Sequence, residues 1–168
     1  MGRLDPGGSW PPGANGFGSA RGVAAGRARD VVLIGKGQSS MEDELLSAAT
    51  KQGRTVTDES LPERGLFYRA DHFPFAKRGV PVLLMMGLAG ASDIVEGGKT
   101  AGQAWIDDYT GRCYHQACDA WDVKWNLDGA VQDIDLVQTI AGDLANSTRW
   151  PAWKPGSEFA AARGKVGK

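Results

Sequence analysis

The sequence predicts an α/β fold, and we expect a three-layer α/β/α sandwich with a mixed and mostly parallel sheet. Two unbroken apolar runs, 30–34 and 80–86, have the pattern of strands that are buried on both faces. The stretch 128–147 is amphipathic, with apolar residues at helical spacing. Strands that alternate with helices along a chain are typical of α/β folds.

The predicted strand at 30–34 is followed by a helix with clear start and stop signals. Ser39 and Glu42 have the spacing of a capping box, in which Ser39 accepts from the amide three residues on and Glu42 reaches back. Gly53 ends this helix. Residues 54–57 then have the composition of another short strand.

The second half of the chain contains two further predicted helices. Residues 71–78 predict a short helix with Pro74 in its first turn. After the strand 80–86, residues 87–118 form a long glycine-rich connection, and loops of that length are usually functional. The helix 128–147 has an apolar stripe made of Leu127, Ala130, Val131, Ile134, Val137, Ile140 and Leu144. The tail aromatics Trp150, Trp153 and Phe159 are expected to pack back on the body.

The two ends of the chain differ in composition from the body. Residues 1–28 are dense in Gly, Pro, Ser and Ala without periodicity, so we expect a disordered arm. The folded body is expected over 29–163, and 164–168 is expected to fray.

Charge and hydropathy exclude several classes of protein. The formal net charge of -1 argues against binding to nucleic acid or to an anionic membrane surface. No apolar run approaches the roughly 20 residues of a membrane span, and the N-terminus has glycines and prolines where a secretory signal would be apolar. The sequence therefore predicts a soluble protein without an export signal of its own.

The candidate chemical groups are two histidines and two cysteines near the predicted strand 80–86. His72 follows Asp71, and His115 lies between Cys113 and Cys118, so both imidazoles are close to carboxylates or thiols. The two cysteines could form a small disulfide, remain free thiols, or bind zinc together with a histidine. In α/β folds ligands gather where strands end, which points to the connection after 80–86.

Two segments of the sequence resemble the motifs of one known protein family. FYRADHFPFAKRGVP at 67–81 is similar to the motif aromatic-Arg-Ser-Asp-His-x-Pro-Phe-x-x-x-Gly-(Ile/Val)-Pro, and YHQACD at 114–119 is similar to Tyr-His-x-x-x-Asp. Both motifs belong to the zinc aminopeptidases of metallopeptidase family 28, clan MH. The resemblance extends over about 29–163 and includes the segment WKPGSEF at 153–159. The body therefore resembles the C-terminal portion of that family's catalytic domain.

The resemblance implies a two-zinc hydrolase that removes N-terminal residues from peptides. His115 matches the final zinc ligand of the family, and Tyr114 matches a tyrosine that in some members stabilises the tetrahedral intermediate by a hydrogen bond. Asp71 and His72 match residues that lie beside the metal site and support it. A Cys113–Cys118 disulfide occurs at this place in some exported relatives. Members are often periplasmic or secreted, which leaves the location of this chain open.

The other parts of the family's zinc site do not map onto the chain. The His-x-Asp, Asp-Asn and Glu-Glu segments, including the general base, have no counterpart, and GVAAG precedes 27–29 where Asn-x-Asp-Met is expected. A tight zinc site needs three or four protein ligands, so zinc binding by this chain is expected to be weak or absent. Either the chain is truncated or a second polypeptide supplies the missing ligands. We expect a truncated chain that is inactive alone and needs the missing upstream half.

Two other functions remain compatible with the motifs. One is a non-catalytic pseudoenzyme or binding domain that keeps the cleft without metals. The other is an acyltransferase similar to glutaminyl cyclase, which shares the fold and uses one zinc. Cyclases tend to have Trp-His at this place, so the pair Tyr114-His115 favours the peptidase.

Overall fold

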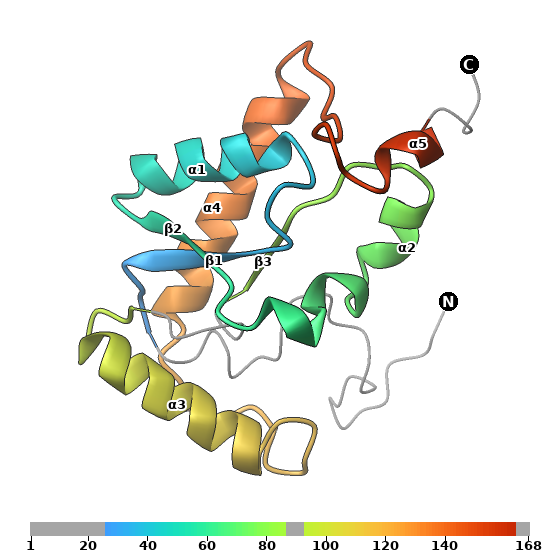
Figure 1. Cartoon of the computed structure of the whole chain (residues 1–168). Helices are drawn as coiled ribbons and strands as arrows, with labels where there is room; N and C mark the ends of the chain where they lie inside the picture. Colours follow the sequence, from blue (N-terminus) through green and yellow to red (C-terminus); the bar gives the residue numbers. More distant parts are fainter. Residues whose placement is uncertain (1–25, 87–92, 164–168) are drawn as a thin grey trace, which may run out of the picture.

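The computed structural model of the chain describes residues 26–86 and 93–163 (Figure 1). The arm predicted over 1–28 lies outside the described residues except for its last three, and the predicted tail 164–168 lies outside them entirely. Residues 26–28 lie against the body, where the Val95 N–H donates to the Arg27 carbonyl at 2.8 Å and Ala28 pairs with Ile94 in an isolated bridge.

The described sheet has the strand order β2-β1-β3. Its strands are β1 (Asp30–Ile34), β2 (Thr55–Asp58) and β3 (Leu84–Met86). Strands β1 and β2 are parallel, with Val31 opposite Val56, whereas β1 and β3 are antiparallel, with Leu33 opposite Met85. The prediction of a mixed α/β fold is therefore confirmed, with one parallel and one antiparallel pair among the described strands.

Strand β1 is buried along its whole length, as its unbroken apolar pattern predicts. Alternate side chains point to opposite faces of a strand, so Val31 and Leu33 face one way and Val32 and Ile34 the other. On the first face lie α1 (Met41–Lys51) and α4 (Asp128–Ala145), which Figure 1 shows together beside the sheet. That cluster also contains Leu45, Ala48, Ala49, Leu136 and Ile140.

The second face of β1 is covered by short elements, the 3-10 turn η3 (Leu66–Tyr68) and the helix α2 (Phe73–Lys77), and by the chain before the helix α5 (Ala160–Arg163). The 3-10 turn η2 (Pro62–Arg64) precedes η3 and has no buried residue. Phe67, Ala76 and Phe159 pack there against Val32 and Ile34. The Trp153 indole N–H donates to the Gly79 carbonyl at 3.0 Å. Trp150, in contrast, is 83% exposed, so the prediction that all three tail aromatics pack back was wrong for this residue.

Helix α3 (Gly98–Arg112) corrects the prediction of a continuous loop over 87–118. Glycines at 97, 98, 102 and 111 hide the helical signal, because glycine is a poor helix former. The buried residues Gly102, Ile106 and Tyr109 nevertheless recur at helical spacing. In Figure 1 this helix lies apart from α1 and α4, below the sheet.

Two other predicted elements differ from the structure in extent. The run 80–86 forms a strand only over its last three residues, and Pro81 cannot donate to a sheet ladder. In α4, Leu136 and Ile140 are the buried apolar residues, whereas Val131 and Ile134 of the predicted stripe are exposed. No helix in the described part of the chain combines the length and the hydropathy that a bilayer crossing requires.

Glu42 caps the start of α1 by accepting hydrogen bonds from the preceding backbone. This is the half of the predicted capping box in which the glutamate reaches back to Ser39. Its carboxylate accepts from the N–H groups of residues 37, 38 and 39 and from the Lys154 ammonium. Burial pushes the pKa of Glu42 upward, but these hydrogen bonds together outweigh it and hold the pKa below its ordinary value. The other half differs, because the Ser39 hydroxyl donates to the Val82 carbonyl and accepts from the Met41 N–H.

Replacement of Gly35 by alanine is expected to lower the free energy of unfolding by about 2 kcal/mol. Gly35 has φ of +68°, and a Cβ there would overlap the buried Phe67 ring. Gly37→Ala is the matched control, since its φ is +94° but nothing lies within 4 Å of the added atom. Urea denaturation of both variants separates the effect of the overlap with Phe67 from the effect of backbone strain. Equal losses of unfolding free energy in the two variants would contradict a contribution from the overlap.

Candidate functional site

The segment from Cys113 to Asp119 forms a closed loop at the end of α3. Cys113 is the C-cap residue of the helix, and its sulfur is bonded to that of Cys118, with the two Cα atoms 5.2 Å apart. The structure thus contains the disulfide among the three arrangements that the sequence left open. The bond restrains the turn that carries Tyr114 and His115.

Asp119 fixes the backbone of this loop from inside. One of its carboxylate oxygens accepts from the Tyr109 hydroxyl at 2.9 Å and from the His115 backbone N–H at 3.3 Å. The Tyr114 N–H donates to the Tyr109 carbonyl at 2.9 Å. Because Tyr109 is buried in α3, these bonds tie the loop to the rigid part of the helix.

His115 has a backbone conformation that is rare for a residue with a side chain. Its φ is 59°, and it is the one non-glycine residue with a positive φ in ranges 26–86 and 93–163. Such a conformation costs on the order of 1–3 kcal/mol and is found often at functional sites, where the surroundings impose it. Here the disulfide and Asp119 impose it, and the imidazole is exposed.

Aromatic rings support the His115 imidazole in a continuous series. Trp105 stacks on Tyr109 with a centroid distance of 5.3 Å, and Tyr109 meets Tyr114 edge to face at 5.8 Å. The Tyr114 ring meets the imidazole edge to face at 4.0 Å. Helix α3 therefore orients Tyr114 and His115 together through ring contacts.

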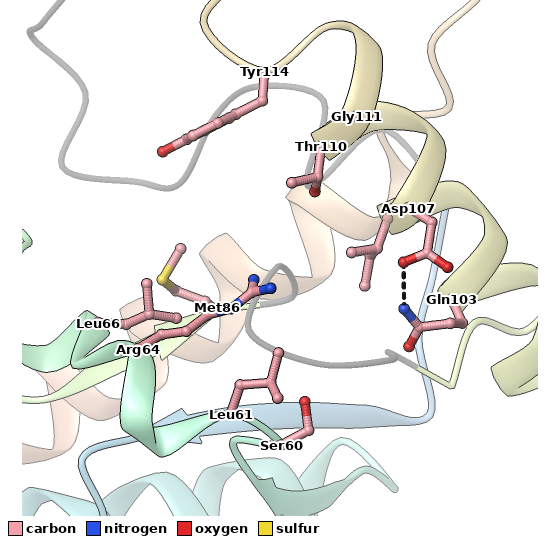
Figure 2. Close-up of a pocket in the computed structure, with 11 residues that line it drawn as sticks. Ser60, Leu61, Arg64, Leu66, Met86, Gln103, Asp107, Thr110, Gly111 and Tyr114 are labelled. Carbon is pink, nitrogen blue, oxygen red and sulfur yellow. Dashed lines mark hydrogen bonds between the residues drawn. The ribbon is translucent and has the colours of Figure 1, made fainter.

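A cavity of about 600 Å³ lies between the chain around η2 and one face of α3 (Figure 2). One wall consists of Ser60, Leu61, Arg64, Leu66 and Met86. The opposite wall consists of Gln103, Ile106, Asp107, Thr110, Gly111 and Tyr114. Tyr114 is the predicted site residue that lines this cavity, and its ring extends over the gap in Figure 2.

His72 lies at the N-cap of α2 and is half-buried, whereas its neighbour Asp71 is exposed. Its ring meets the Phe67 ring edge to face, with the ring centres 4.6 Å apart. Both ring nitrogens are buried, and neither has a hydrogen-bond partner among the described residues at the usual distance and angle. Burial lowers the pKa of His72, and this effect exceeds the opposing pull of the Phe67 carbonyl and the Asp71 carboxylate.

The two predicted motifs do not come into contact. In the described part of the chain, no hydrogen bond or ring contact joins His115 to Asp71 or His72. Tyr114 lines the cavity, whereas Asp71 and His72 do not, and the His72 ring packs against the buried Phe67 instead. No group of three or more metal-ligating side chains gathers among the residues that the structure describes.

Two charged residues of the cavity, Arg64 and Asp107, are not among the candidate residues that the sequence indicates. Asp107 shares one face of α3 with Gln103 four residues before it, and Tyr114, which follows the end of the helix, lines the same cavity wall. That spacing is visible in the sequence, but it has meaning only once 98–112 is recognised as a helix.

The stability of the protein is expected to fall as the pH drops below about 6.5 because of His72. Its folded pKa is lower than its unfolded pKa, so the unfolded chain binds the proton more readily. The stabilisation is therefore complete above the unfolded pKa and is lost as the pH falls toward the folded pKa. Urea titrations between pH 8 and 5 check this expectation. His72→Gln should flatten that slope, and an unchanged slope would contradict it.

Comparison with known proteins adds one finding to this geometry. The family model described as peptidase family M28 matches residues 22–138, which is more than half of the 168 residues. No curated protein and no solved structure matches the chain significantly. The matched range contains the Asp71-His72 motif, helix α3 and the disulfide-closed loop with Tyr114 and His115. The chain therefore belongs to peptidase family M28.

Proposed function

We propose that the chain is part of a zinc-dependent aminopeptidase that removes N-terminal residues from peptides. Membership of the family supports a metallopeptidase-type function in general terms. The observation that carries the finer proposal is the loop Cys113–Asp119. It presents an exposed imidazole in a strained backbone conformation beside a cavity large enough for a peptide end.

In this proposal Tyr114 and His115 have separate roles. We propose His115 as a metal ligand, because its imidazole is exposed and its backbone is fixed by Asp119. Tyr114 lines the cavity, and its hydroxyl would donate a hydrogen bond to the oxyanion of the tetrahedral intermediate. Asp71 and His72 would support the site from outside the described cavity, where the His72 ring packs against Phe67, the neighbour of the lining residue Leu66.

The described residues do not by themselves fit a zinc ion. A tight site needs three or four protein ligands, and no such group is present among the residues of 26–86 and 93–163. We propose that the other ligands and the general base come from the upstream half of a complete domain. That half would also extend β1, β2 and β3 into the larger, mostly parallel sheet of a three-layer sandwich.

An assay of hydrolysis tests the proposal. Aminoacyl-nitroanilides are offered with added zinc to this chain alone and to the chain joined to an upstream half that carries the His-x-Asp, Asp-Asn and Glu-Glu segments. We expect turnover only from the joined protein. Its absence from both, with the joined protein folded by circular dichroism, would contradict the assignment.

The same protein preparations test the two other candidate functions. A pseudoenzyme or binding domain would leave the joined protein without tight zinc binding in calorimetry. An acyltransferase of the glutaminyl cyclase type would cyclise an N-terminal glutamine of a peptide rather than release it.

A further inference from the structure

We propose that the disulfide Cys113–Cys118 is a thiol-reactive switch that controls the direction of the His115 imidazole. A dithiol reductant would attack the Cys118 sulfur and open the loop, and the turn that carries His115 would then change from one standard type to another. The reaction and the change of turn require neither zinc nor hydrolysis. Their meaning as regulation of a metal site rests on the proposed function of His115.

The two bonded cysteines differ in their access to solvent. Cys118 is exposed, whereas Cys113, the C-cap residue of α3, is only 7% exposed. Exchange between a thiol and a disulfide depends on which of the two sulfurs the incoming thiolate can reach. Attack is therefore directed to the Cys118 sulfur, and Cys113 is the group that leaves.

The exchange proceeds in two steps with one dithiol molecule. In the first step a thiolate of the reductant forms a bond to the Cys118 sulfur. The bond to Cys113 breaks, and its electron pair and a proton from water remain on the Cys113 sulfur. In the second step the other thiolate of the reductant attacks its own sulfur in the mixed disulfide and releases Cys118, which is protonated in turn. The chain gains two electrons and two protons, and the reductant becomes a disulfide.

The residues Cys113 to Gln116 form a turn in which the Gln116 N–H donates to the Cys113 carbonyl at 2.8 Å. Tyr114 and His115 are the two central residues of this turn. His115 has φ of 59°, and no other non-glycine residue in the described ranges has a positive φ, so Tyr114 has a negative one. This combination is typical of a type II turn, which favours glycine or asparagine at its second central residue. A histidine there would prefer the negative φ of a type I turn.

Two restraints keep His115 in this unfavourable conformation. The disulfide closes the chain directly around the turn, with the Cα atoms of Cys113 and Cys118 5.2 Å apart. The other restraint is the hydrogen bond from the His115 N–H to Asp119, which is long, at 3.3 Å, and exposed. A long and exposed hydrogen bond stabilises less than a strained φ destabilises. Opening of the disulfide therefore releases the turn.

The change from a type II to a type I turn rotates the peptide group between the two central residues. This peptide group contains the His115 N–H, so the bond to Asp119 is lost and the imidazole is redirected together with its backbone. The bond from Gln116 to Cys113 is common to both turn types and remains. The loop therefore has two discrete arrangements, and the oxidation state of the cysteines selects between them.

Serine variants test the direction of attack. Cys113→Ser leaves the exposed Cys118 as the single thiol of the chain, and Cys118→Ser leaves the buried Cys113. We expect dithiobis(nitrobenzoate) to react at least about tenfold faster with Cys118 than with Cys113, because access governs thiol reactivity. The same variants unfolded in urea are the matched control and should react at equal rates. Equal rates in the folded variants, or a faster Cys113, would overturn the assignment of Cys118.

Nuclear magnetic resonance of the full 168-residue chain, labelled with ¹⁵N and free of metal, tests the change of turn. In the oxidised chain His115 should show the strong Overhauser effect between its own Hα and amide proton that a positive φ produces. After reduction with dithiothreitol this signal should fall to the intensity of other residues, while the Gln116 amide stays protected from exchange. The amides of β1 are the internal control and should not shift.

Three results of this measurement would overturn the inference. One is a strong His115 signal that persists after reduction. Another is a Gln116 amide that loses its protection, because the loop would then melt instead of changing its turn type. Shifts throughout β1 would show that the disulfide holds the whole fold.

The link to the metal has a separate readout. In the joined protein, Cys118→Ser should weaken zinc binding about tenfold in calorimetry, because a redirected imidazole is lost as a ligand. Unchanged zinc affinity would contradict the regulation of a metal site. Because the spectra are recorded without metal, failure of the hydrolysis assay leaves the change of turn standing, and failure of the change of turn leaves the hydrolysis assay standing.

Discussion

Replacement of Arg54 by alanine is expected to lower the free energy of unfolding by about 3 kcal/mol. The Arg54 side chain is only 4% exposed and forms an ion pair with Asp133 of α4 at 2.7 Å. It also donates to the Asp30 carbonyl in β1 from two of its nitrogens, at 2.6 and 3.2 Å. The change therefore leaves a buried carbonyl and a partly buried carboxylate without their partner.

The pair Lys51–Asp143 is the matched control for Arg54. It also joins the region of α1 to α4, at 3.0 Å, but its side chains are 60% and 50% exposed. Lys51→Ala should change the free energy of unfolding by no more than about 0.5 kcal/mol. Urea denaturation at neutral pH measures both variants. Similar losses in the two would show that burial does not distinguish the pairs.

Arg54 also shows where the sequence was insufficient. Residues 54–57 were recognised as a strand, yet nothing in the local pattern indicates that the first side chain is buried. Nor does that pattern indicate that the partner of Arg54 is Asp133, an acid in the first half of α4. A contact between residues 79 positions apart depends on how α4 packs on β1, which periodicity alone does not reveal.

Replacement of His115 by alanine in the joined protein is expected to lower kcat/KM for an aminoacyl-nitroanilide by at least about 100-fold. Losing even a residue beside a metal site typically costs roughly 10- to 100-fold, and His115 is proposed as a ligand itself. Steady-state kinetics with added zinc measures the change. Activity within a few-fold of the parent protein would contradict the role of His115 as a metal ligand.

Tyr114→Phe is the matched variant from the neighbouring position. It keeps the ring that meets His115 at 4.0 Å and removes only the hydroxyl. The proposed hydrogen bond forms in the transition state, so kcat should fall while zinc affinity stays unchanged. A loss of zinc affinity in this variant would show that the two residues do not have separate roles.

The sequence was sufficient to predict the motifs of the candidate site, but it did not predict the cavity or the backbone conformation of His115. The strings around His72 and around Tyr114-His115 are visible in the sequence and lie within the range of the family match. The cavity that Tyr114 lines depends on α3, and the glycines of α3 conceal its helical pattern in the sequence. The left-handed conformation of His115 arises from Asp119 and the disulfide, so it follows from contacts rather than from the preference of histidine itself.

The zinc affinity of the joined protein and of its His115→Ala variant tests the central claim most directly. Calorimetric titration of the metal-free proteins gives both dissociation constants under the same conditions. If the loop Cys113–Asp119 presents a ligand, the variant should bind at least one zinc ion tenfold or more weakly, because an imidazole is lost from a site of three or four ligands. Equal zinc affinity in the parent and the variant would contradict the account.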